Sequence, residues 1–64
     1  MPLIQVSIMQ GRSQEQKAAF AAKVTAAACE TLDVKPEQVR VLINELPPQH
    51  WFVAGTAKTP PKTT

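Results

Sequence analysis

Residues 13–32 read SQEQKAAFAAKVTAAACETL, and this stretch determines the architecture of the whole chain. It contains no glycine or proline and is rich in alanine, the best helix former. Ser13 and Gln16 form the pattern of a capping box, in which each side chain bonds the free backbone amide of the other residue. We therefore expect a helix that begins at Gln14 and ends near Leu32.

Apolar and small side chains recur on this stretch at helical spacing. Many of them are alanines, so other backbones can approach this helix closely, as packing between subunits requires. The residues that we expect to face a sheet are Phe20, Val24, Ala27, Ala28, Thr31 and Leu32, and those that we expect nearer solvent are Lys17, Lys23 and Glu30.

One strand is expected before the helix in the sequence and another after it. From Leu3 to Met9, LIQVSIM alternates apolar and polar residues with a period of two. From Val39 to Leu46 the same period puts valine and isoleucine on one face, and Pro36 starts a short turn before this strand. The order strand, helix, strand predicts a βαβ unit with two parallel strands and a right-handed crossover.

The end of the chain has less to bury. After Pro47-Pro48, the run WFVAG at residues 51–55 is apolar enough for a short strand or hairpin arm. We assign residues 1–57 to one domain and residues 58–64 to a tail that we expect to be flexible. The expected fold class is therefore α/β, a single βαβ unit with one long helix and a short C-terminal hairpin or strand.

The length of the chain predicts an oligomer. A chain of 64 residues buries only about 60% of the surface that its unfolded form exposes. Small folds usually add disulfides, a metal or partner subunits. The single cysteine, Cys29, excludes an internal disulfide, and the single histidine, His50, argues against a structural metal site. Self-association is the remaining way to stabilise the fold. An isolated two-stranded sheet is also only marginally stable, which again favours an oligomer.

The charge of the chain and its opening residues argue against binding to nucleic acid and against membrane insertion. Seven basic and five acidic residues give a net charge of +2, and Lys58 and Lys62 near the end supply two of the seven. No basic stripe for nucleic acid is evident. The opening MPLIQ has no cationic segment leading into a long apolar run, so we expect no secretion signal and no membrane span. Cytoplasmic residence follows as the expectation, and an unpaired cysteine fits it.

Pro2 directly follows the initiator methionine, and removal of Met1 would leave a secondary amine at the start of a strand. An α-amino group has a pKa of about 8, and nearby cations or low-dielectric surroundings lower it because both disfavour the protonated form. Pro2 is therefore a candidate general base near neutral pH. Proline at position two is also common in unrelated proteins, so this feature alone does not assign catalysis.

Four short motifs add to that candidate. The chain reads PLI at residues 2–4, GRS at residues 11–13, VRV at residues 39–41 and HW at residues 50–51. Together, with their spacing, these motifs resemble the 4-oxalocrotonate tautomerase family over about residues 2–57. The resemblance implies an isomerase without cofactor or metal, in which the proline amine takes a proton from an enol or dienol and returns it at another position.

The resemblance also implies roles for single residues. Pro2 matches the catalytic base. Arg12 and Arg40 match the arginines that hold the carboxylate and carbonyl oxygens of the substrate, a role that suits the planar guanidinium. Trp51 matches the aromatic residue that makes the pocket apolar. The implied substrate is a small carboxylated enol or 2-oxo acid, and the implied assembly is a homohexamer built as a trimer of dimers.

Geometry adds a constraint that does not depend on the family. In a parallel βαβ unit, Pro2 begins the first strand and Arg12 follows its end, so the two residues lie roughly 25 Å apart. If both serve one site, Arg12 must come from a neighbouring chain. The family often carries a glycine-rich hairpin after its aromatic residue, whereas residues 52–55 here keep only Gly55.

Two alternatives stay open at this point. The same proline could serve hydration, dehalogenation or decarboxylation, which usually require a carboxylate or another water-activating group, and Asn44 and Glu45 are the candidates. The chain could also be a non-catalytic oligomeric binding subunit, with Trp51 and Phe52 as interface anchors. A retained Met1 would favour that second alternative, because it turns the proline nitrogen into an amide.

Overall fold

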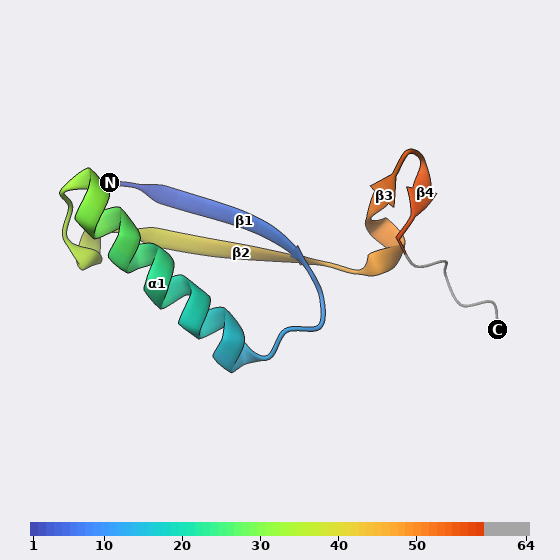
Figure 1. Ribbon diagram of the computed structural model, residues 1–64, viewed down its shortest axis with the longest axis horizontal. Helices are drawn as coiled ribbons and strands as arrows, with labels where there is room; N and C mark the ends of the chain where they lie inside the picture. The colour runs from blue at the N-terminus through green and yellow to red at the C-terminus, as the bar shows by residue number, and fades with distance from the viewer. Residues whose placement is uncertain (59–64) are drawn as a thin grey trace.

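The computed structural model describes residues 1–58 as a βαβ unit followed by a small hairpin (Figure 1). Of the tail that we expected to be flexible, residues 58–64, the structure describes Lys58, and residues 59–64 lie outside the described residues. The elements are β1 (Leu3–Met9), α1 (Gln14–Leu32), the 3-10 turn η1 (Pro36–Gln38), β2 (Arg40–Leu46), the 3-10 turn η2 (Pro48–His50), β3 (Phe52–Val53) and β4 (Thr56–Ala57). The expected fold class is confirmed.

Both ends of α1 follow from the sequence. The capping box is present, because the Ser13 hydroxyl accepts a hydrogen bond from the Gln16 amide at 3.1 Å and the Gln16 side chain accepts one from the Ser13 amide at 3.0 Å. At the other end Asp33 adopts a left-handed conformation with φ 56°, which stops the helix. The helix bounds predicted from the sequence are therefore confirmed.

The sheet consists of β1 and β2, paired in parallel with Leu3 opposite Arg40 and Met9 opposite Leu46. Helix α1 covers one face of this sheet (Figure 1). The residues that face the helix are mostly half-buried and apolar. The opposite face is open, and its Leu3 and Leu42 are 56% and 54% exposed. One chain therefore covers only half of its own sheet.

The core of one chain is correspondingly small, since Ala28 and Val39 are the buried apolar residues among those that the structure describes. The expected helix face was only partly right. Phe20, Val24 and Ala28 face the sheet, with Phe20 still 43% exposed, whereas Ala27, Thr31 and Leu32 are exposed. The cause is the width of the sheet. Because it has only two strands, a narrow row of helix residues covers it and the residues beside that row stay exposed.

Lys17 is a second correction, because we expected it near solvent. Its side chain is 19% exposed and lies on the sheet side of α1, where it forms an ion pair with Glu45 of β2 at 2.9 Å. The start of the helix is thus joined to the end of β2 by charge rather than by apolar packing.

The hairpin β3–β4 extends beyond the end of β2 (Figure 1). Its two-residue turn consists of Ala54 with φ 53° and Gly55 with φ 80°. Two central residues with positive φ are typical of a type I′ turn, which favours glycine or asparagine. Ala54 is therefore strained, because its Cβ makes the left-handed conformation unfavourable.

No helix within residues 1–58 has the length and apolar character needed to cross a bilayer.

We predict that Ala54→Gly stabilises the protein. Glycine removes the left-handed strain but adds freedom to the unfolded chain, so we expect a net gain of about 0.5–1 kcal/mol in the free energy of unfolding. Thermal unfolding at one fixed chain concentration measures it. Ala22→Gly on the exposed side of α1 is the matched control and should destabilise by a similar amount. Destabilisation by both changes would contradict the strain at Ala54.

Candidate active site

Pro2 lies at the amino-terminal end of the sheet, half-buried and immediately before β1. Its carbonyl accepts a hydrogen bond from the Arg40 amide at 3.0 Å, which continues the pairing of β1 with β2. Met1 is 81% exposed, so nothing in the fold shields the bond between Met1 and Pro2 from a peptidase. The backbone position of Pro2 is therefore fixed while its neighbour Met1 stays accessible.

Arg40 begins β2 at this same end, and its side chain lies on the exposed face of the sheet. Its guanidinium donates hydrogen bonds to the backbone carbonyls of Glu37 at 2.7 Å and of Val39 at 3.4 Å. These bonds leave other N–H groups of the guanidinium available, because arginine has five donors. One predicted anion-binding residue thus shares an end of the sheet with Pro2.

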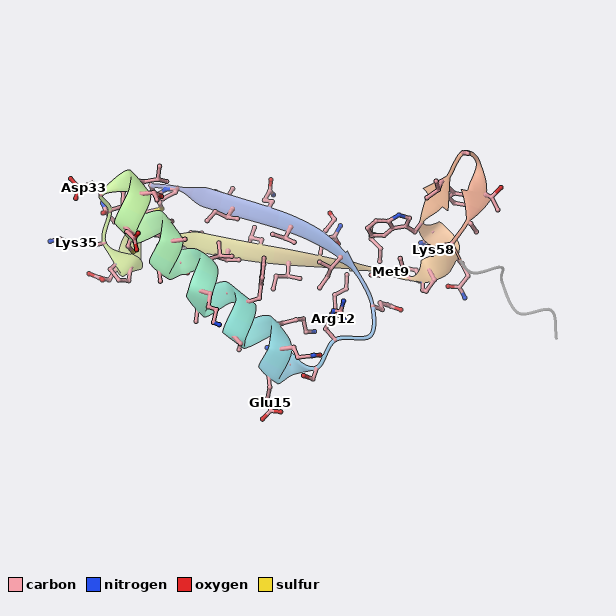
Figure 2. The ribbon with its side chains drawn as sticks, in the orientation of Figure 1. Met9, Arg12, Glu15, Asp33, Lys35 and Lys58 are labelled. Atoms are coloured by element: carbon pink, nitrogen blue, oxygen red, sulfur yellow. The ribbon has the colours of Figure 1, made fainter. Side chains whose placement is uncertain are left out.

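Arg12 lies at the opposite end, in the connection between β1 and α1. Figure 2 shows it at the far end of the helix from the turn that carries Asp33 and Lys35. Its side chain borders a groove of about 230 Å³ between α1 and the sheet, and most of the groove surface is apolar. The residues that line the groove are Val6, Ile8, Arg12, Gln16, Lys17, Phe20 and Ile43.

Trp51 lies at the same end of the sheet as Arg12, beyond the carboxyl end of β2. It follows η2, donates its amide to the Pro48 carbonyl at 3.1 Å and accepts the Lys58 amide at 2.7 Å. These bonds hold the base of the hairpin, and the indole is half-buried. Phe52, the next residue, is exposed. Side chains alternate along a strand, so Trp51 and Phe52 point to opposite sides.

The four predicted site residues therefore fall into two pairs. Pro2 and Arg40 lie at the amino ends of the two strands, and Arg12 and Trp51 follow the carboxyl ends. Seven strand residues separate the ends by about 23 Å. This separation agrees with the spacing argument from the sequence. The position of Arg40 beside Pro2 was not foreseen, although its place at the start of the second parallel strand already indicated it.

The residues considered for water activation do not form a free acidic site. Glu45 is engaged with Lys17 on the helix side of the sheet, and Asn44 is exposed on the other side. His50 is exposed in η2, and Cys29 is a free, half-buried thiol of α1. Within residues 1–58 no three side chains of histidine, cysteine, aspartate or glutamate gather as they would around a metal ion.

Known proteins resemble this chain over nearly its whole length. The family described as tautomerase enzyme matches residues 2–60. A probable tautomerase of Ralstonia nicotianae is 50% identical over 66 residues, which cover 97% of this chain and 94% of that protein. A 2-hydroxymuconate tautomerase of Comamonas testosteroni is 40% identical, with 89% of this chain and 90% of that protein covered.

Solved structures agree with the sequence matches. A heterohexamer 4-oxalocrotonate tautomerase from Chloroflexus aurantiacus superposes with a TM-score of 0.86 at 43% identity, and covers 91% of this chain and 94% of its own. A 4-oxalocrotonate tautomerase isozyme from Methylibium petroleiphilum gives a TM-score of 0.86 at 49% identity, with 89% of each chain covered. By its sequence and by its fold, this chain belongs to the tautomerase family.

Proposed function

We propose that the chain is a subunit of an oligomeric tautomerase in which the amine of Pro2, freed by removal of Met1, is the general base. While Met1 is attached, the nitrogen of Pro2 is an amide and has no useful basicity. Removal of the exposed Met1 leaves a secondary amine with a lone pair at the end of the sheet. This proposal rests on family membership and on the position of Pro2 at the start of β1.

The separation of the two residue pairs carries the proposal. A single chain cannot bring Arg12 to Pro2 across about 23 Å of strand. If a second chain runs in the opposite direction, the end of its sheet that carries Arg12 and Trp51 lies beside Pro2 of the first chain. Each site is then composed of two chains, and a twofold pair contains two such sites.

Oligomer formation is supported by the surfaces that one chain leaves open. Within the described residues, β1 and β2 each have one unpaired edge, and a sheet of two strands is marginal in water. Leucine side chains on the open face and the exposed Phe52 and Val53 of the hairpin add apolar surface. The relative from Chloroflexus aurantiacus is a heterohexamer, which supports a hexamer of three dimers here.

The chemistry is an isomerisation, so no oxidant, reductant or water is consumed. The Pro2 amine accepts a proton from an enol or dienol hydroxyl, and the resulting ammonium returns it to a carbon of the same molecule. Arg12 and Arg40 bind the carboxylate and carbonyl oxygens of the substrate, and the guanidinium at the carbonyl oxygen stabilises negative charge that develops there during the transfer. Trp51 keeps water out of the pocket, which strengthens these interactions.

The proposed substrate is a small carboxylated 2-hydroxy or 2-oxo acid. The Comamonas testosteroni relative is a 2-hydroxymuconate tautomerase, which makes this dicarboxylated dienol the first compound to test. Hydration, dehalogenation and decarboxylation are less well supported, because Glu45 is already paired with Lys17. Residence in the cytoplasm is part of the same proposal and is supported by the free thiol of Cys29.

We predict that Pro2→Ala lowers kcat/KM for ketonisation of 2-hydroxymuconate by about 100-fold or more, the range of general-base catalysis. Pro2→Ala still has an amine at the start of the processed chain, whereas an uncleaved extension before Pro2 leaves only an amide there. The extended chain should therefore be less active than Pro2→Ala. Intact mass confirms the loss of Met1 in each sample, and Pro36→Ala in η1 is the matched proline control. Full activity of Pro2→Ala would refute Pro2 as the base, and an inactive parent protein that has lost Met1 would favour the binding-subunit alternative.

We predict that two inactive variants restore activity in a mixed oligomer. If Pro2 and Arg12 of one site come from different chains, refolding Pro2→Ala with an equal amount of Arg12→Ala leaves about a quarter of the sites intact. Activity per chain should recover accordingly. A mixture of Pro2→Ala with the double variant Pro2→Ala/Arg12→Ala is the control and should stay inactive. No recovery in the first mixture would mean that each chain forms its own site.

A further inference from the structure

One charged residue interrupts the apolar side of the sheet that faces α1. The other positions on that side are isoleucine and valine, at residues 4, 6, 8, 41 and 43, whereas β2 carries Glu45. Its partner Lys17 reaches down from the first turns of α1, with Nζ 2.9 Å from the carboxylate. The two side chains are 19% and 34% exposed. Within residues 1–58 this is the only ion pair between side chains.

The ion pair lies beside the segment that carries Arg12. At one end of this segment the Gln10 amide donates to the Leu46 carbonyl of β2 at 2.9 Å. At the other end the Lys17 amide donates to the Ser13 carbonyl at 3.1 Å. Arg12 lies between these two anchors, next to Gly11 with φ 127°, and has no regular structure of its own. Its position therefore depends on how firmly the start of α1 is held.

We propose that the Lys17–Glu45 ion pair is a positioning device for Arg12, an inference that rests on the proposed function. The pair ties the start of α1 to the end of β2, and so closes a loop around the Arg12 segment. Lys17 and Arg12 border the same groove, but the charge of Lys17 is taken up by Glu45. Arg12 is left as the cation that meets the substrate carboxylate.

Apolar packing would hold this point less precisely. A methionine at position 17 could contact the apolar wall of the groove, but it would make no directional bond to β2. A hydrogen-bonded ion pair fixes both distance and direction, and partial burial reduces its screening by salt. Loss of the pair should let the start of α1 move, and Arg12 would move with it.

The test compares Lys17→Met with Lys23→Met, which removes the same charge from an exposed position of the same helix. Arg12 binds the carboxylate before and during proton transfer, so its displacement weakens ground-state and transition-state binding alike. We expect Lys17→Met to raise KM for 2-hydroxymuconate about tenfold, with kcat changed less than about threefold, in an oligomer of unchanged mass. Lys23→Met should keep the parent KM.

Two further variants separate positioning from general stability. In an Arg12→Ala background, Lys17→Met should raise KM no further, because there is no guanidinium left to position. The exchanged pair Lys17→Glu/Glu45→Lys should recover most of the parent KM. Equal KM values for Lys17→Met and Lys23→Met, or additive effects of Lys17→Met and Arg12→Ala, would overturn the inference. If Lys17→Met does not assemble, Glu45→Asp, which keeps the charge, is judged by the same KM criterion.

Amide hydrogen exchange keeps this test independent of the proposed function. A parent protein without tautomerase activity would refute the proposed function, but the tie between α1 and β2 could still be measured. Residues 10–13 should exchange at least about tenfold faster in Lys17→Met than in Lys23→Met. Equal exchange rates in the two variants would overturn the positioning role even if the protein is an active tautomerase.

Discussion

The parallel pairing of β1 with β2 determines where every candidate site residue lies. It sets Leu3 opposite Arg40, and so gathers Pro2 and Arg40 at one end of the sheet and sends Arg12 and Trp51 to the other. A parallel pair requires a long crossover, which α1 supplies. The proposed site uses both ends, so it can form only between chains, and catalysis would then require assembly.

The scarcity of buried residues leads to the same conclusion by a separate route. With only Ala28 and Val39 buried among residues 1–58, a single chain has too little core to offset the entropy of ordering its backbone. The open face of the sheet and the hairpin remain to be covered. Assembly would therefore supply both the missing core and the missing half of each site, which explains how so short a chain can support a reaction.

Local sequence signals predicted the fold well, because each acts over a few residues. The capping pair Ser13 and Gln16, the proline of η1 and the period of two in both strands all produced the expected elements. The helix face was harder to predict. Helical spacing alone does not reveal how wide the sheet is, so Thr31 and Leu32 were assigned to the sheet side and the ion pair of Lys17 with Glu45 was missed.

The sequence was enough to name candidate site residues, but not to show how they are arranged. Spacing along the chain indicated that Pro2 and Arg12 lie apart, whereas the grouping of Trp51 with Arg12 became visible only once β2 and η2 had been placed. Glu45 illustrates the remaining gap. As a lone acidic residue in a strand it was a candidate for water activation, and its contact with Lys17 depends on the orientation of α1 over the sheet.

A crystal structure of the processed protein with a carboxylated 2-oxo acid bound would show whether each site is shared between two chains. We expect that Met1 is absent and that a reacting atom of the ligand lies about 3–3.5 Å from the Pro2 nitrogen of one chain. The ligand carboxylate should be held by Arg12 of a second chain. A ligand bound at Pro2 with every contact from one chain, or with no contact to Arg12, would contradict it.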